Sequence, residues 1–145
     1  MRNWKLRRNA ISPVHAVADT SFWIDAWRGE VDETEKHHIA ELWHHGGNVL
    51  PQIVWLELLV GLRSPAERDY LFDLKEVSQW VPLSEADGLE AEKLAELLRK
   101  KGMVLTATDL LVLTVAHRLR LPLLHHDEDF SRVLKLPDFA SLRVG

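Results

Sequence analysis

The amino-acid sequence predicts an α/β domain with a central, mainly parallel sheet, because short apolar segments alternate along the chain with longer helical patterns. VHAVAD at residues 14–19 and LPLLHH at 121–126 are apolar at most positions, and VSQWVPL at 77–83 also has the form of a short strand. Apolar strands of this kind are typical of a parallel sheet that helices cover on both faces. A chain of 145 residues is long enough to form one such domain around a single core.

Helical patterns fill the intervals between these strands. Ser64, Ser84 and Thr106 each stand three residues before an acidic residue, which is the spacing of a capping box at a helix start. Either Thr20 or Ser21 is expected to cap the first helix. The expected helices cover residues 22–28, 32–45, 53–63, about ten residues from Pro65, a segment that ends at 100–102, and 110–120.

Two further segments complete the expected order of elements. NVLP at 48–51 is interpreted as a connection between helices, and SLRV at 141–144 is expected to form a last short strand. Neither an internal repeat nor a low-complexity linker interrupts the chain. Residues 14–145 are therefore expected to form one domain.

Composition excludes several classes of protein and site. The chain has no cysteine, so disulfide bonds and thiolate zinc sites are excluded, and any metal ion must be held by oxygen or imidazole. No run of about 18 apolar residues indicates a membrane span and no secretory signal is recognisable, so a cytoplasmic protein is expected. The net charge of −4 is unlike that of a generic nucleic-acid binder. Positive charge gathers in an N-terminal arm at residues 1–13, expected to be disordered, which contains Arg2, Lys5, Arg7 and Arg8.

Acidic residues follow two of the predicted strands or lie close to a helix start. Asp19 ends the first strand segment, and Asp127 and Asp129 follow the last buried one. Ligands bind at the carboxyl ends of parallel strands, where the strand-to-helix turns converge. Asp109, in the first turn of the helix before that last strand, and Glu57, inside an otherwise apolar run, can reach the same edge. Four separate segments are therefore expected to bring carboxylates together.

A cluster of carboxylates needs a cation, because two carboxylates about 4 Å apart repel by roughly 4 kcal/mol at an effective dielectric of about 20. Oxygen ligands favour Mg²⁺ or Mn²⁺, which also accept phosphate oxygens of a substrate. Such an ion activates water and offsets the charge that grows on a phosphoryl group. The residues thus indicate hydrolysis of a phosphodiester, with metal held by Asp19, Asp109 and Asp127 and the acidic pocket completed by Glu57 and Asp129.

The acidic motifs also resemble those of a known family. ADTSFWID at 18–25, WLELLVGLR at 55–63, TDLLVLTVAHRLRLPLL at 108–124 and HDEDF at 126–130 are together similar to the PIN-domain ribonucleases, in particular the VapC toxins of toxin–antitoxin pairs. The resemblance spans residues 14–142 and rests on the four motifs in this order. It implies a three-layer α/β/α sandwich and Mg²⁺- or Mn²⁺-dependent endoribonuclease activity on RNA. It also implies a homodimer, a larger toxin–antitoxin assembly, and a VapB-type antitoxin partner.

Motif by motif, the resemblance implies a role for each of these acids. The five residues expected in the catalytic pocket are Asp19, Glu57, Asp109, Asp127 and Asp129. Ser21 matches a small hydroxyl residue that often neighbours the metal site in the family. His125 departs from the pattern, because the family commonly has Thr or Ser at that position. The sequence leaves open whether His125 changes how the site handles water.

The paired histidines and two further acids are expected to lie outside the site. Adjacent histidines on a helix lack the spacing of three or four residues that a zinc-binding pair needs. We therefore expect the helical pairs to lie on the solvated surface, at His37, His38, His44 and His45. Asp25 is expected to be a surface or salt-bridge residue, and Glu128 is expected to face water.

Two alternative functions are compatible with the same motifs. One is a PIN-like nuclease that processes RNA or cleaves DNA ends without a toxin role. The other is a catalytically idle domain that uses its acidic edge to bind a basic protein segment. Growth arrest relieved by a small partner protein would separate a toxin from the first alternative. An absence of both Mn²⁺ binding and RNA cleavage would favour the second.

Overall fold

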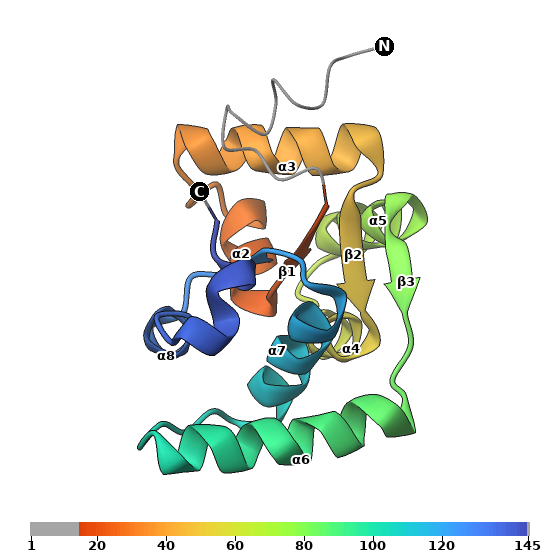
Figure 1. Cartoon of the computed structure of the whole chain (residues 1–145). Coiled ribbons are helices and arrows are strands. Elements are labelled where there is room, and N and C mark those ends of the chain that lie inside the picture. Colours follow the sequence, from red (N-terminus) through yellow and green to blue (C-terminus); the bar gives the residue numbers. More distant parts are fainter. Residues whose placement is uncertain (1–14, 145) are drawn as a thin grey trace.

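The computed structural model describes residues 15–144 and contains a four-stranded, all-parallel sheet with the strand order β3-β2-β1-β4 (Figure 1). The strands are β1 (Ala16–Ala18), β2 (Asn48–Pro51), β3 (Gln79–Val81) and β4 (Leu123–Leu124). The helices are α2 (Thr20–Trp27), α3 (Glu33–His45), α4 (Gln52–Val60), α5 (Pro65–Val77), α6 (Glu85–Lys100), α7 (Ala107–Leu119), α8 (Glu128–Val133) and the 3₁₀ helix η1 (Pro137–Leu142). The basic arm expected at residues 1–13 lies outside the described residues.

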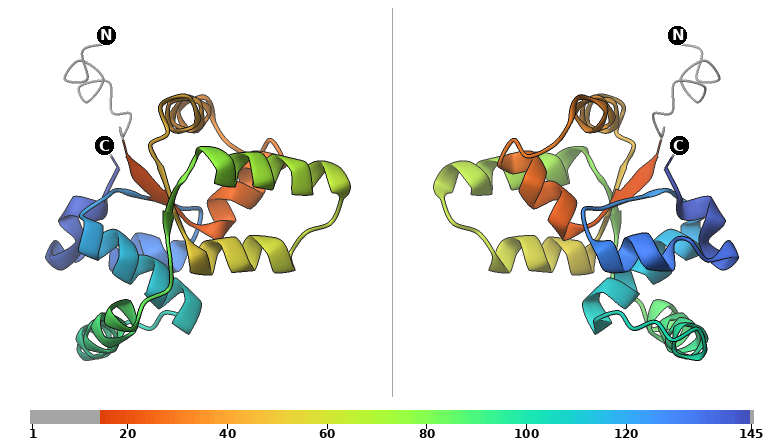
Figure 2. Two further views of the ribbon diagram at one scale, coloured as in Figure 1. Left: turned by 90° about the vertical axis from the view of Figure 1, so that its right-hand side faces the viewer. Right: turned by 90° about the vertical axis from the view of Figure 1, so that its left-hand side faces the viewer.

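Helices cover both faces of the sheet. Figure 2 shows α2, α4 and α5 on one side of the strands and α6, α7 and α8 on the other, while α3 lies across the end where the strands begin. The expected three-layer α/β/α architecture around a parallel sheet is therefore confirmed. Within residues 15–144, no helix combines the length and the apolar character needed to cross a bilayer.

The core lies where these helical layers meet the sheet. β1 is buried along its whole length and pairs on both sides, with Val17 opposite Val49 of β2 and Leu123 of β4. The largest fully buried side chains come from helices on both faces and include Phe22, Trp23, Phe130 and Phe139. Burying a side chain of this kind stabilises the fold by roughly 1.5–3 kcal/mol relative to leaving it exposed. The strand ends that carry the acids are thus anchored in a well-packed core.

The segment NVLP forms strand β2, so its interpretation as a connection is wrong. β2 pairs with β1 on one side and β3 on the other, and it is buried at all four positions. Because Asn48 and Pro51 stand at its two ends, only a short apolar centre remains, and this is too short to indicate a strand from the sequence. The buried Asn48 amide donates to the Ser78 hydroxyl at 2.8 Å, which offsets part of its desolvation. Gly46, with φ of 65°, adopts the left-handed conformation that ends α3 and turns the chain into β2.

The chain after β4 also differs from the sequence-based expectation. SLRV does not form a strand, because Leu142 ends η1 with its side chain fully buried. Arg143 then donates from its guanidinium to the backbone carbonyls of Leu134, Lys135 and Leu136. β4 itself has two residues rather than six, and the acidic stretch that follows it opens the short helix α8, which the sequence did not predict.

The first helix begins earlier than expected. α2 starts at Thr20, and its N-cap is Asp19 rather than Thr20 or Ser21. Asp19 follows β1 directly, so the strand, the cap and the helix succeed one another without a loop. A carboxylate caps a helix as well as a hydroxyl does, and the extended backbone at the end of a strand suits the cap position. The side chain of Asp19 is consequently held at the carboxyl edge of the sheet.

An ion pair between the buried carboxylate of Asp87 and the half-exposed side chain of Arg118 joins α6 to α7. Asp87 is 2% exposed and accepts two hydrogen bonds from Arg118, at 2.6 Å from Nε to Oδ1 and 3.0 Å from Nη2 to Oδ2. A carboxylate this deeply buried is tolerated only when a partner of this kind satisfies it. The pair therefore fixes the position of α7, whose first turn carries Asp109.

Arg118→Met is expected to lower the free energy of unfolding by about 2 kcal/mol, because it leaves the Asp87 carboxylate buried without a partner. The double variant Asp87→Leu/Arg118→Met is expected to recover most of that loss, since both charges are then absent. Urea unfolding followed by circular dichroism measures both effects. Arg99→Met, which breaks an exposed pair with Glu96, is the control and should change stability by no more than about 0.5 kcal/mol. A double variant as unstable as Arg118→Met would contradict this role.

Candidate functional site

Asp19 supplies the most buried carboxylate at the carboxyl edge of the sheet. It is 3% exposed, and the Ser21 hydroxyl donates to its Oδ2 at 2.9 Å. Its other oxygen, Oδ1, is buried and accepts no hydrogen bond from any residue in the described part of the chain. Burial raises the pKa of Asp19, hydrogen bonds from Ser21 oppose this shift, and the charge of Asp127 adds to it. A buried carboxylate oxygen without a donor is a position that a cation would satisfy.

Glu57 reaches the same edge from the middle of α4. The Thr20 hydroxyl, in the first residue of α2, donates to Glu57 Oε1 at 2.9 Å. This hydrogen bond joins α2 to α4, two helices that pack against each other. The sequence indicated Thr20 only as a candidate helix cap, and its place directly after Asp19 was the one signal for a role in the site. Thr20 and Ser21 thus hold two different carboxylates.

Asp109 is the third residue of α7, and its place follows from the cap of that helix. The Thr106 hydroxyl caps α7 by accepting a hydrogen bond from the Asp109 amide at 3.2 Å. Burial, followed by the charge of Asp19, raises the pKa of Asp109 to about 6. The charges of Asp127 and Glu57 add to this shift, and Thr106 opposes it. Three other carboxylates therefore lie within electrostatic reach of Asp109.

Asp127 and Asp129 occupy the start of α8 but differ in their surroundings. Asp127 is the N-cap of α8, and its Oδ1 accepts a hydrogen bond from the Asp129 amide at 2.7 Å. The Asp129 carboxylate forms an ion pair with Arg132, and its side chain is 46% exposed. The structure therefore brings four acids together, and we call them the four-acid cluster: Asp19, Glu57, Asp109 and Asp127. Asp129 supports this cluster through its backbone, while its carboxylate is already neutralised by a cation of the chain.

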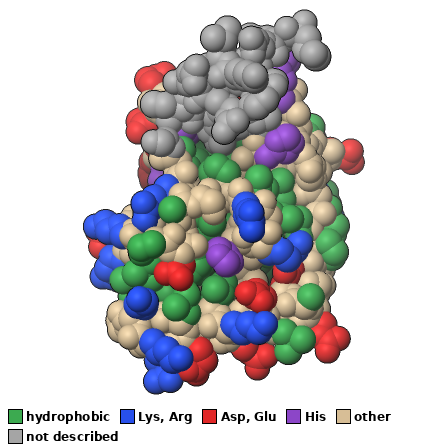
Figure 3. All heavy atoms as spheres, in the orientation of Figure 1, with side chains coloured by type: hydrophobic (Ala, Val, Ile, Leu, Met, Phe, Trp, Pro, Cys, Tyr) green, Lys and Arg blue, Asp and Glu red, His purple; other side chains and the backbone are tan. Residues whose placement is uncertain are grey.

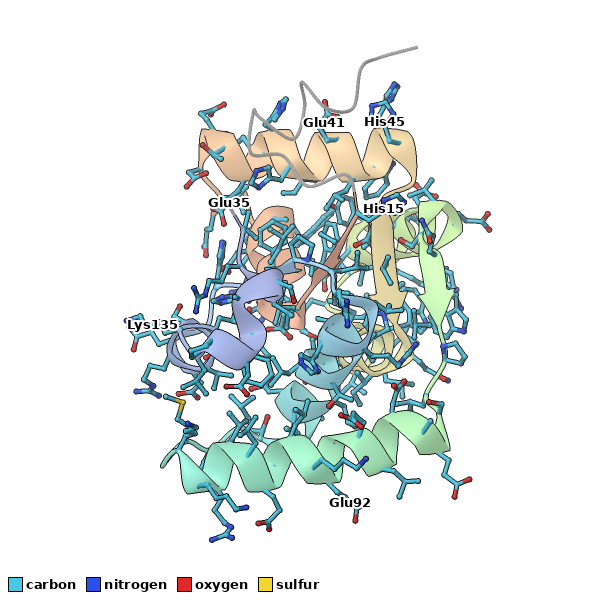
Figure 4. All side chains as sticks on the ribbon, in the orientation of Figure 1. His15, Glu35, Glu41, His45, Glu92 and Lys135 are labelled. Carbon is cyan, nitrogen blue, oxygen red and sulfur yellow. The ribbon has the colours of Figure 1, made fainter. Side chains whose placement is uncertain are left out.

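A second group of contacts holds the loop between β4 and α8. The His126 amide donates to the Ser21 hydroxyl at 3.2 Å, so Ser21 links this loop to Asp19. The His126 ring pairs with Asp25 of α2 at 2.6 Å and with Glu35, which Figure 4 shows on the side of α3 that faces the domain. Partial burial opposes a charge on this ring, but the hydrogen bonds to Glu35 and Asp25 raise the pKa of His126. Sequence analysis did not identify this bridge between three elements.

One histidine expected on the solvated surface is buried, so that expectation is wrong for His38. The residue is 4% exposed, and burial lowers the pKa of its side chain. His38 and Leu42 are one helical turn apart on α3 and share the face that packs inward. Its Nδ1 atom has no hydrogen-bond partner among residues 15–144.

The four-acid cluster fits a hard divalent cation by its chemistry. All four donors are carboxylates, which are ligands that Mg²⁺ and Mn²⁺ prefer. Oδ1 of Asp19 is unpartnered, and burial followed by the charge of Asp19 raises the pKa of Asp109, so a cation would be favourable beside both carboxylates. In the described residues, no three Asp, Glu or His side chains are gathered tightly enough to form a ready-made ligand set.

Comparison with known proteins assigns the chain to a family. Residues 16–136 match the model of the PIN domain, so this chain belongs to the PIN domain family. No sequence among the curated proteins matches it.

Solved structures of toxin–antitoxin complexes share the fold. One similar chain belongs to VapBC2 from Rickettsia felis bound to a DNA fragment from its promoter, at 17% identity over 85% of this chain and 93% of that chain, with a TM-score of 0.67. VapBC-1 from nontypeable Haemophilus influenzae is 21% identical over 83% and 93% of the two chains, with a TM-score of 0.65. FitAcB from Neisseria gonorrhoeae is 16% identical over 90% and 94%, with a TM-score of 0.64. Similarity at these identities shows the fold.

Asp109→Asn is expected to stabilise the metal-free protein above pH 6. In the folded chain the Asp109 carboxyl keeps its proton up to a pKa of about 6, whereas in the unfolded chain it loses the proton near pH 4. The folded state therefore binds more protons between these values, and the wild type loses stability as the pH rises through them. Asparagine cannot ionise and avoids this loss, which is about 1 kcal/mol after allowance for solvent screening at a partly exposed group.

Thermal unfolding in EDTA at pH 4 and pH 7.5 measures this effect, and a gain in Tm of about 3 °C is expected at the higher pH only. Asp129→Asn is the matched control, because that carboxylate is paired with Arg132 and should give no gain. An equal gain at both pH values would show that the effect does not come from ionisation of Asp109.

Proposed function

We propose that this chain is a divalent-metal-dependent endoribonuclease and the toxin of a toxin–antitoxin pair. The proposal rests above all on the four-acid cluster, in which Asp19 has a buried, unpartnered oxygen and Asp109 has a raised pKa. This cluster stands at the carboxyl edge of a parallel sheet, where α/β proteins bind their ligands. The VapBC and FitAcB complexes with the same fold support a VapB-type antitoxin as partner. The family resemblance of the sequence supports a homodimer and a cytoplasmic location.

Different residues of the chain would have different roles in this mechanism. Asp19, Asp109 and Asp127 would hold a Mg²⁺ or Mn²⁺ ion. When bound, that ion supplies positive charge that activates water and offsets the charge growing on the phosphoryl group. Glu57 would accept a hydrogen bond from the attacking water and orient it for in-line attack on phosphorus, leaving a 5′-phosphate and a 3′-hydroxyl. Asp129 would complete the acidic pocket if its pair with Arg132 opened.

Hydroxyl groups would orient two of these carboxylates before the substrate arrives. Ser21 donates to Asp19 and Thr20 donates to Glu57, so neither carboxylate is free to rotate without losing a hydrogen bond. A preset orientation of this kind lowers the entropic cost of reaching the reactive geometry. RNA affinity would come from basic side chains outside the acidic site. Figure 3 shows Lys and Arg side chains interspersed with acids over the visible face.

Asp19→Asn and Asp109→Asn are each expected to reduce Mn²⁺-dependent cleavage of RNA by roughly 100-fold or more, because each variant removes a carboxylate that would hold the ion. The measurement is incubation of the purified full chain with total RNA and Mn²⁺, followed by sequencing of the new 5′ ends. Glu128→Gln is the matched control, since Glu128 is an exposed acid of the same motif and its loss should leave cleavage unchanged. Full activity in Asp19→Asn would overturn the assignment.

Expression in a host cell tests the toxin role separately from the nuclease activity. A toxin is expected to arrest growth, and co-expression of the cognate VapB-type protein is expected to restore it. An RNA-processing or DNA-end nuclease would cleave nucleic acid in vitro without arresting growth. A catalytically idle module would neither bind Mn²⁺ in calorimetry nor cleave RNA.

A further inference from the structure

We propose that His125 is a positioning residue that fixes Asp127, with one ring nitrogen accepting a hydrogen bond from the Asp127 backbone amide. In the structure, His125 Nδ1 accepts a hydrogen bond from the Asp127 amide at 3.2 Å. The inference rests on the proposed function in one respect, because it takes Asp127 to be a metal-holding residue.

The geometry of this bond is that of a local turn. A Ser or Thr hydroxyl, or an Asx carbonyl, commonly accepts a hydrogen bond from the backbone amide two residues further along the chain. His125 makes the same two-residue contact through its ring. The His125 ring therefore closes the kind of local turn that a hydroxyl or an amide side chain can close, although it is larger than either.

Neighbouring contacts fix both the ring and the residue that it holds. The His125 ring packs on Phe130, with ring centroids 5.5 Å apart and an angle of 54° between the planes. Phe130 is fully buried in α8, so it provides a rigid support for the ring. Asp127 is also held from its other side, because its Oδ1 accepts from the Asp129 amide at 2.7 Å. Backbone and carboxylate of Asp127 are thus fixed by two separate hydrogen bonds.

A different role for His125 would use its other ring nitrogen. The residue also lines a cavity of about 340 Å³ together with His38, Ser131 and Lys135. A substrate group in that cavity could meet the ring, in which case His125 would act on RNA and not through Asp127. A third possibility is that the ring only fills space beside Phe130. These roles predict different responses to substitution.

Four substitutions at residue 125 separate these roles. His125→Asn keeps an acceptor at the same number of bonds from Cβ as Nδ1, and His125→Thr supplies the hydroxyl of the family. His125→Phe keeps an aromatic ring on Phe130 but has no acceptor. His125→Gln places its acceptor one bond further out, near the position of Nε2. His37→Phe, at an exposed histidine of α3, controls for loss of a histidine elsewhere.

The full-length variants are compared by Mg²⁺ calorimetry and by hydrogen exchange of the Asp127 amide in the metal-free protein. Asn and Thr are expected to keep the Mg²⁺ affinity within about twofold, while Phe and Gln weaken it by about tenfold, the range for loss of a supporting hydrogen bond. The Asp127 amide should exchange at least about threefold faster in the Phe and Gln variants than in the wild type. Circular dichroism and Tm establish that each variant is folded.

Each contrary pattern overturns the inference. If His125→Phe kept its Mg²⁺ affinity and His125→Asn lost it, the His125 ring would only pack against Phe130. If His125→Gln kept its Mg²⁺ affinity and His125→Asn lost it, the ring would act through Nε2 and not through Nδ1. Unchanged amide exchange in the Phe variant would show that the hydrogen bond to Asp127 does not form. A wild type that binds Mg²⁺ without cleaving RNA would overturn the nuclease proposal alone, whereas a wild type that binds no Mg²⁺ would overturn both.

Discussion

Parallel pairing between β1 and β4 is the constraint on which the candidate site depends, because it ends both strands at one edge of the sheet. Val17 lies opposite Leu123, and the Asp19 amide donates to the Leu124 carbonyl at 2.8 Å. This bond fixes the backbone of Asp19 beside the short segment that leads to Asp127. A shift of β4 by one residue would move its end by about 3.3 Å and turn its side chains to the opposite face. The strand register therefore decides whether acids distant in sequence can meet.

Helix termini help the chain to tolerate several like charges at one edge of the sheet. Asp19 and Asp127 are N-caps of α2 and α8, and Asp109 lies in the first turn of α7. A carboxylate at a helix N-terminus gains typically about 0.3–1 kcal/mol from the helix dipole. Repulsion between close carboxylates amounts to several kcal/mol at about 4 Å, so the helix ends reduce it without cancelling it. Burial, followed by the charge of Asp19, raises the pKa of Asp109 to about 6, and a bound cation would offset the part that comes from charge repulsion.

Sequence patterns predicted the parts of the fold that depend on local chemistry. The strand-to-helix order, the caps at Ser64, Ser84 and Thr106, and the parallel sheet all follow from residues close together in the chain. β2 escaped prediction because four residues that include Asn48 and Pro51 have no recognisable strand period. The hydrogen bond between Thr20 and Glu57 could not be predicted either, since it depends on how α4 is rotated about its axis against α2. The ion pair between Asp129 and Arg132 could not be predicted either, because the sequence alone does not show which of several neighbouring charges pair.

The contacts of the four-acid cluster also indicate how chemistry and substrate choice are separated in this domain. Ser21, Thr106 and His125 each form a hydrogen bond with an acid no more than three residues away, whereas Thr20 reaches across 37 residues to Glu57 and the Asp19 amide donates to the Leu124 carbonyl of β4. The local orientation of three acids is therefore set within strand-to-helix or loop-to-helix turns, while the sheet register and the Thr20 contact bring the acids to one edge. Carboxylates and a cation act on any phosphodiester, so they do not distinguish one RNA from another. Under the proposed function, selection of an RNA would come from surfaces outside these turns, and such surfaces could change in sequence without disturbing the acids.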